Sequence, residues 1–230
     1  MKIGVLTWLY NGNYGSILQA YALQRYLRNK NYIVESINYK PSTKEKVINL
    51  VKNKNSLRLF IDKIDIFMMK IIAKENVKAI NEKFDGFRTD QFCLTACYRS
   101  PDEITEIEGK YDLYLCGSDQ IWSPMLLNPV YYFDFLKKND KLISYACSFG
   151  VNNVPVKKKT IIANLLEKFD SISVRELQGK DIVADLLGKD VDITVDPTLL
   201  LSSKEWDAVA TDRIVKEDYV VCYFLSYSRA

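Results

Sequence analysis

The chain has 230 residues, of which 48% are hydrophobic and 27% charged, and it contains no histidine. This composition is that of a globular protein with a buried core, and it excludes disordered, collagen-like and coiled-coil chains. The absence of histidine excludes Ser-His-Asp and Cys-His nucleophile systems and the HExxH zinc site. Acid–base chemistry must therefore use carboxylates, lysines, tyrosines or cysteines.

The net charge of +3 is unevenly distributed. Residues 40–88 contain 12 Lys and Arg against 6 Asp and Glu, a balance of +6 that leaves −3 for the rest of the chain. A solvated lysine face is the simpler interpretation of this segment, and contact with anionic lipid or another negatively charged polymer is the alternative. It has only four aromatic residues on which bases could stack, so we expect no nucleic-acid partner.

The first 39 residues predict a βαβ unit. Lys2–Thr7 is a nearly continuous apolar run, typical of a strand covered on both faces. A turn at Asn11–Gly15 leads into a predicted helix over Ser16–Lys30, and the β-rich run Tyr32–Tyr39 follows. Such a unit predicts a parallel sheet.

The rest of the chain continues the alternation of strands and helices after a predicted helical insertion at about residues 43–90. A capping box at Ser100–Glu103 marks a further helix start. Strands are expected at Tyr111–Cys116, Leu142–Cys147, Ser171–Val174, Val191–Val195 and Tyr219–Tyr227, and helices at Val156–Phe169, Glu176–Leu187 and Ser203–Val209. The pattern predicts an α/β fold with a Rossmann-like, doubly wound and mostly parallel sheet.

The cysteines and the N-terminal segment indicate in which cellular compartment the protein is expected. Five cysteines occur without a CxxC spacing, and three of them lie in apolar, strand-like runs, so we expect buried, reduced thiols. The N-terminus has no small-residue cleavage site after its short apolar run and is interpreted as a strand. No window reaches the ~18 apolar residues of a membrane span, and we expect a cytoplasmic protein.

Polar residues follow the first predicted strand, where an open parallel sheet binds ligands. Gly12 and Gly15 permit a tight turn, and the N–H groups of the helix start could receive an anion. The spacing is not GxGxxG and no acid ends the second strand, so a dinucleotide site is not expected. A plain strand-to-helix turn is the simpler interpretation.

The strand at residues 111–116 runs into a second polar group, Gly117-Ser118-Asp119-Gln120, followed by Ile121 and Trp122. Burying so many hydrogen-bonding groups at a sheet edge is costly without a use, which favours a binding role. Trp122 could then stack on a sugar or base. In the alternative, Asp119 caps a short helix and Trp122 packs in the core.

Charged residues follow the later strands. Arg175 is either paired with an acid such as Glu176 or Asp196 or offered to an anionic ligand. Asp196 precedes a proline, and bracing that turn is its simpler role. Tyr145 and Ser148 are expected to face the same edge of the sheet.

Together these motifs resemble those of the polysaccharide pyruvyl transferase family. The matching stretches, in order along the chain, are IGVLT, NYGSILQAYALQRYL, VESINY, YDLYLCGSDQIW, ISYACSFG, SISVRE and DPTLLL, the last followed by Trp206. The combination of GSDQIW and DPTLLL behind NYGSILQAYAL is specific to this family, and the stretches span nearly the whole chain.

The resemblance implies a GT-B-like architecture of two Rossmann-like lobes and transfer of a pyruvyl group from phosphoenolpyruvate to sugar hydroxyls as a ketal. The acceptor would be a surface polysaccharide or its lipid-linked precursor. Phosphoenolpyruvate is the donor substrate, and no cofactor or metal is expected. The implied catalytic residues are Asp119, near the acceptor hydroxyl, and Arg175, which binds an anion. The implied substrate-binding residues are Asn13, Tyr14, Gly15, Gly117, Ser118, Gln120, Trp122 and Asp196.

The resemblance also implies that residues 1–215 form one lobe and that residues 216–230 begin a second. Family members place further basic residues in that lobe, including a histidine. We therefore expect this chain to be truncated and nearly inactive alone. The basic helices at 43–88 could contact the inner face of the membrane. Alternatives are a non-catalytic lobe that binds a sugar or nucleotide sugar, half of a GT-B glycosyltransferase, or an interaction subunit.

Overall fold

The computed structural model describes residues 1–42, 74–137 and 140–222. The chain forms two compact units, residues 1–200 and residues 201–230, and each is described by itself. The first unit contains the sheet and every candidate site residue. The lobe boundary expected at residue 215 and the GT-B-like arrangement stay predictions.

The first unit is built on a six-stranded parallel sheet in the order β2-β1-β3-β4-β5-β6, which confirms the predicted Rossmann-like α/β class. The strands in chain order are β1 Lys2–Leu6, β2 Ile33–Ser36, β3 Leu113–Asp119, β4 Leu142–Cys147, β5 Ser173–Val174 and β6 Asp192–Ile193. The long central strands are the apolar runs expected for strands covered on both faces.

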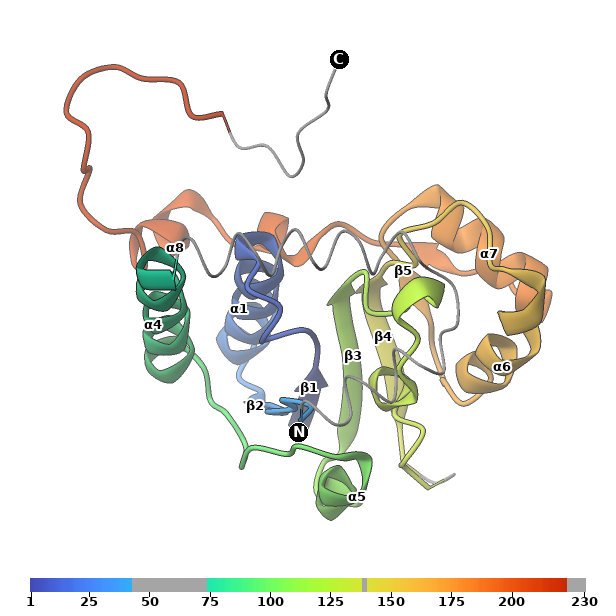
Figure 1. Ribbon diagram of the computed structural model, residues 1–230. Helices are drawn as coiled ribbons and strands as arrows, with labels where there is room; N and C mark the ends of the chain where they lie inside the picture. Colours follow the sequence, from blue (N-terminus) through green and yellow to red (C-terminus); the bar gives the residue numbers. More distant parts are fainter. Residues whose placement is uncertain (43–73, 138–139, 223–230) are drawn as a thin grey trace. The chain divides into compact units, whose positions relative to one another are not determined.

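Helices cover both faces of this sheet, as Figure 1 shows, so the fold is doubly wound. One face packs Ile3, Val5 and Leu115 against Leu23 of α1. The other packs a larger, aromatic-rich core against α6, α7 and short 3₁₀ turns. The helices of this unit are α1 Tyr14–Asn29, α4 Lys74–Gln91, α5 Pro101–Ile104, α6 Val156–Leu166 and α7 Leu177–Leu187.

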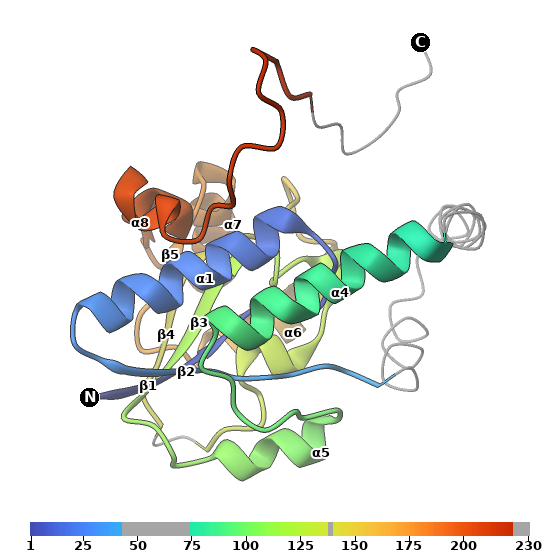
Figure 2. The same ribbon diagram turned by 90° about the vertical axis from the view of Figure 1, so that its left-hand side faces the viewer.

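Helix α4 is the described end of the predicted helical insertion, whose residues 43–73 lie outside the described part. It runs beside α1 (Figure 2), with Phe84 4.9 Å from the ring of Tyr14. Its Arg88 is buried and donates from Nη1 to the carbonyl oxygen of Leu9 at 2.9 Å. Because Leu9 lies in the loop between β1 and α1, α4 helps to fix that loop.

Several expected elements differ from the structure. β5 and β6 have only two residues each, and β6 is exposed, since it forms the sheet edge where long strands are disfavoured. Of the strand expected at Tyr219–Tyr227, residues 219–222 are exposed and not in a strand, and 223–227 lie outside the described residues. In the second unit, α8 (Ser203–Asp207) has a capping box formed by Ser202 and Glu205 and ends two residues earlier than predicted.

The five cysteines are free thiols, but only two are buried. Cys116 and Cys147 lie on β3 and β4 with their Sγ atoms 3.7 Å apart, and burial raises the pKa of the Cys147 thiol well above its usual value. The expectation of burial is wrong for Cys93, Cys97 and Cys222, which lie outside the named strands and are exposed. Among the described helices, none is long and apolar enough to cross a membrane.

Gly117→Ala is expected to destabilise the protein, because a Cβ at this position would lie 2.3 Å from Cδ2 of the buried Leu23. Overpacking of this kind costs about 1–3 kcal/mol in the free energy of unfolding, which urea denaturation measures. The matched control is Gly86→Ala on the exposed face of α4, which has open space and should stabilise by about 0.5–1 kcal/mol. A Gly117→Ala protein as stable as the wild type would contradict the close packing of α1 on β3.

Glu35→Gln is expected to weaken the dependence of stability on acid pH. The Lys2 side chain, 3.0 Å away, lowers the pKa of the Glu35 carboxyl, and Tyr111 adds a hydrogen bond at 2.8 Å. A lowered pKa gives stability that is present above the pKa of the unfolded chain and lost as pH falls through the folded value. Between pH 7 and 3 the wild type should therefore lose more unfolding free energy than the variant. At pH 7 the cost stays below about 1 kcal/mol, since the pair is over a third exposed.

Candidate functional site

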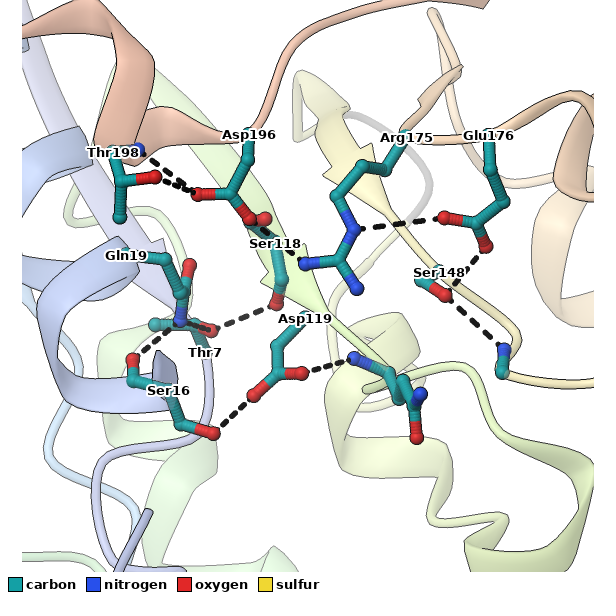
Figure 3. Close-up of polar contacts among 12 residues, drawn as sticks. Thr7, Ser16, Gln19, Ser118, Asp119, Ser148, Arg175, Glu176, Asp196 and Thr198 are labelled. Atoms are coloured by element: carbon teal, nitrogen blue, oxygen red, sulfur yellow. Dashed lines mark hydrogen bonds and ion pairs between the residues drawn. The ribbon is translucent and has the colours of Figure 1, made fainter. Parts of the chain in front are cut away.

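The sheet order places a topological switch point between β1 and β3. The chain leaves β1 toward β2 on one side, whereas β3 and all later strands lie on the other. Ligands of open parallel sheets bind at such a point, beyond the carboxyl ends of the strands. Figure 3 shows the polar residues found there, from the ends of β1, β3, β4 and β5, the start of α1 and the turn after β6.

Asp119 is the central residue of this edge. Its backbone has a φ of 75°, in the left-handed region that costs a non-glycine residue about 1–2 kcal/mol. Its Oδ2 accepts a hydrogen bond from the Ser16 hydroxyl, and its Oδ1 accepts one from the backbone N–H of Gln120 at 2.8 Å. Both carboxylate oxygens are thus held where β3 ends.

A buried network ties the start of α1 to the ends of β1 and β3. The Thr7 hydroxyl donates to the carbonyl oxygen of Ser118 at 3.0 Å. Gln19 donates from Nε2 to Thr7 Oγ1 at 3.1 Å and to the carbonyl oxygen of Ser16 at 2.7 Å. Asp119 therefore lies in a frame that joins three elements.

The loop between β1 and α1 supplies two asparagines. Asn13 caps α1, accepting from the Ser16 N–H at 3.3 Å, so the helix starts two residues earlier than predicted. Asn11 donates from Nδ2 to Ser16 Oγ at 2.6 Å. Tyr14 and Gly15 are exposed beside them. The expected turn is thus present, and one of the helix N–H groups is already taken by the cap.

Arg175 is paired, which is one of the two roles the sequence left open. Its Nη1 lies 2.8 Å from Oδ2 of Asp196, and its Nε lies 3.5 Å from Oε2 of Glu176. Asp196 also accepts from the N–H and hydroxyl of Thr198 at 2.9 and 2.7 Å, so it braces its turn as well. Nη2 of Arg175 has no protein partner within the described ranges.

Ser148 links β4 to this group by donating to Oε1 of Glu176 at 2.5 Å and accepting from the Gly150 N–H at 3.1 Å. Tyr145 instead packs on the α1 side of the sheet, and burial raises its pKa. Glu176 and Asp196 pair with the guanidinium of Arg175, and Asp119 adds a third carboxylate, so these groups carry a formal net charge of −2.

Three residues expected to bind substrate are buried. Trp122 has no exposed surface and stacks on Tyr132, with ring centroids 5.6 Å apart. The structure therefore shows the packing alternative and corrects the expected contact of its ring with a ligand: the loop after β3 turns the indole into the aromatic core. Gly117 and Ser118 are covered too, so they shape the edge, whereas Gln120 is exposed on it.

Two cavities, of about 240 and 580 Å³, lie at the opposite edge of the sheet. They are lined by residues at the amino ends of β4, β5 and β6, such as Asp140, Asp170 and Asp192. Across the described part of the chain, no three His, Cys, Asp or Glu side chains are grouped for a metal ion. The polar network around Asp119 and Arg175 is the stronger candidate site, because it brings carboxylates, hydroxyls and a guanidinium together at the carboxyl ends of the strands.

Sequence reasoning missed Thr7, Asn11, Ser16 and Gln19 as site residues. The available signal was the pair Ser16 and Gln19, two polar residues three positions apart on the buried face of α1. Polar side chains at core positions of a helix indicate buried hydrogen bonds.

Comparison with known proteins identifies a family. A family model described as polysaccharide pyruvyl transferase matches residues 13–229. Neither the curated proteins nor the solved structures contain a match. The matched range includes Asn13, Asp119, Arg175 and Asp196.

Asp196→Asn is expected to lower the unfolding free energy by about 1 kcal/mol. The amide keeps an acceptor for Thr198 but loses the charge facing Arg175, and the pair is about one-quarter exposed. The control is Asp190→Asn, whose ion pair with Lys180 is at a side chain 82% exposed and should cost nothing measurable. Equal urea midpoints for the two variants would contradict a structural role of the Arg175–Asp196 pair.

Proposed function

Because this chain belongs to the polysaccharide pyruvyl transferase family, we propose that it acts in transferring the pyruvyl group of phosphoenolpyruvate to two hydroxyls of a saccharide. The product is a pyruvate ketal on a surface polysaccharide or on its lipid-linked precursor. Family membership implies a saccharide acceptor and a donor substrate. The identity of the donor and the roles of the residues below are our proposal.

The reaction sets clear demands on a site. A proton adds to the methylene carbon of phosphoenolpyruvate, and the neighbouring carbon, now electron-poor, bonds to the first hydroxyl oxygen. Phosphate then leaves with the electron pair of its C–O bond, and the second hydroxyl oxygen takes its place. Of the two hydroxyl protons, one balances the new methyl group and the other leaves with phosphate. A base for the hydroxyl protons and cations for the donor are therefore needed.

The position of the Asp119 carboxylate supports binding of the acceptor saccharide, and it is the observation that carries the proposal. The carboxylate lies at the switch point, held on both oxygens by Ser16 and Gln120. Asn13 and Gln120, both exposed, add amide groups for sugar hydroxyls. A net charge of −2 favours a neutral polyol over a trianion at this edge. In our proposal Asp119 accepts the hydroxyl proton.

For the donor, we assign the Nη2 group of Arg175 to an anionic group of phosphoenolpyruvate. The single guanidinium of Arg175, already paired with Glu176 and Asp196, does not balance a trianion. Productive donor binding thus requires further cations. This charge balance supports the expectation that these 230 residues alone transfer pyruvyl groups at a negligible rate. It also favours the second candidate, a lobe that binds saccharide without turnover.

The exposed lysines of α4, Lys78 and Lys83, belong to the basic segment 40–88. Peripheral contact of that segment with the inner face of a membrane stays a prediction, as does a cytoplasmic location.

Saccharide binding tests the proposal. Methyl glycosides of glucose, galactose, mannose and N-acetylmannosamine are titrated into ¹⁵N-labelled protein, and amide shifts are followed by NMR. At least one glycoside should saturate and move the amides of Asn13, Gly15 and Gln120. Asp119→Asn should weaken that glycoside about tenfold, the scale of a charged hydrogen bond.

Asp192→Asn is the matched control, since Asp192 lines the cavity at the opposite edge and should leave the affinity unchanged. Shifts confined to that cavity would contradict the proposed site. Adding phosphoenolpyruvate tests turnover through the new ketal methyl signal. Ketal formed by the chain alone would confirm the chemistry and overturn the expectation of inactivity.

A further inference from the structure

We propose that Asn11 and Ser16 form a positioning relay that fixes the orientation of the Asp119 carboxylate toward the acceptor hydroxyl. The relay is a set of hydrogen bonds that the structure shows, and its link to catalysis rests on the role of Asp119 proposed above. Neither Asn11 nor Ser16 was a candidate site residue from the sequence.

The direction of the hydrogen bonds in the relay is determined by its chemistry. The Asn11 amide is oriented by two contacts: its Oδ1 accepts from the Asn13 N–H at 3.3 Å, and its Nδ2 donates to Ser16 Oγ at 2.6 Å. An amide NH₂ only donates, so Ser16 Oγ must act as the acceptor in that contact. The single hydroxyl proton of Ser16 is then directed to Oδ2 of Asp119.

Ser16 acts through Asp119 and not on a substrate. Its side chain is 3% exposed, in the first turn of α1, where its N–H is bound to the Asn13 cap. Substrate hydroxyls at the exposed edge therefore meet Asp119, which is partly exposed. This makes Ser16 and Asn11 positioning residues.

The relay restricts rotation of the Asp119 carboxylate. The Ser16 hydroxyl holds Oδ2 from the α1 side, and the Gln120 N–H holds Oδ1 from the β3 side. Rotating the carboxylate would break both bonds. The remaining lone pairs therefore face fixed directions, and a hydroxyl bound at the edge meets a base that is already oriented. The proton passes from that hydroxyl to Asp119, while Ser16 keeps its own.

The test combines a spectroscopic readout with binding. In protein labelled with ¹³Cγ aspartate, the Asp119 resonance is assigned by its loss in Asp119→Asn. Ser16→Ala and Asn11→Leu should each shift that resonance and weaken the glycoside that binds the wild type by about tenfold, the loss typical when an orienting partner is removed. Ser16→Thr restores the hydroxyl and should return both readouts toward the wild type.

Thr89→Ala is the matched control, because it removes an exposed hydroxyl of α4 that donates to the carbonyl oxygen of Asp85 and lies outside the relay; both readouts should stay as in the wild type. An unshifted Asp119 resonance in folded Ser16→Ala and Asn11→Leu proteins would overturn the relay. A folded Ser16→Thr protein that behaves like Ser16→Ala would overturn it as well. If Ser16→Ala does not fold, Asn11→Leu decides.

The outcome also separates the relay from the proposed function. If no glycoside binds the wild type but the resonance shifts as expected, the relay stands and the proposed function fails. If glycosides bind at the Asp119 edge and the resonance does not respond to either variant, the proposed function stands and the relay fails.

Discussion

The divergence of the chain at the carboxyl ends of β1 and β3 is the constraint on which the rest of the structure depends. All six strands are parallel, so every connection after a strand starts at one edge, and only between β1 and β3 do the connections lead away in opposite directions. Gly117 lets α1 pack closely on β3 beside this point, and Thr7 and Gln19 join the two elements by buried hydrogen bonds. The position of Asp119 follows from that framework.

Charge then limits what this edge can bind. Arg175 is bound by Asp196 and Glu176, which hold the guanidinium between the turns after β5 and β6. An arginine that is paired with two carboxylates attracts a free anion less strongly, because its positive charge is largely cancelled by the charges of its partners. The same contacts leave the edge acidic and rich in hydroxyl and amide groups. A hydroxyl-bearing acceptor fits such a surface better than a phosphorylated donor does.

The central strands could be predicted because their burial on both faces requires a continuous apolar run. Such a run can be recognised in the local sequence without knowing which strands lie beside it. The local sequence could not predict the length of β6, which depends on the neighbour that this edge strand lacks on one side. Trp122 illustrates a second limit, since a ring beside polar residues can face either a ligand or the core. Ser16 illustrates a third: its contact with Asp119 spans 103 positions, and no local pattern encodes it.

The backbone conformation departs most clearly from what the residue types prefer at the candidate site. Asp119 and Ala146, at the ends of neighbouring strands β3 and β4, both have left-handed backbones, with φ of 75° and 52°. Each costs on the order of 1–2 kcal/mol and persists only because the surroundings determine it. Ala146 is fully buried and Asp119 is held on both oxygens, so packing and hydrogen bonds offset the strain. Stability alone favours glycine at a left-handed position, whereas the placement of a carboxylate there is explained by what that carboxylate is positioned to do.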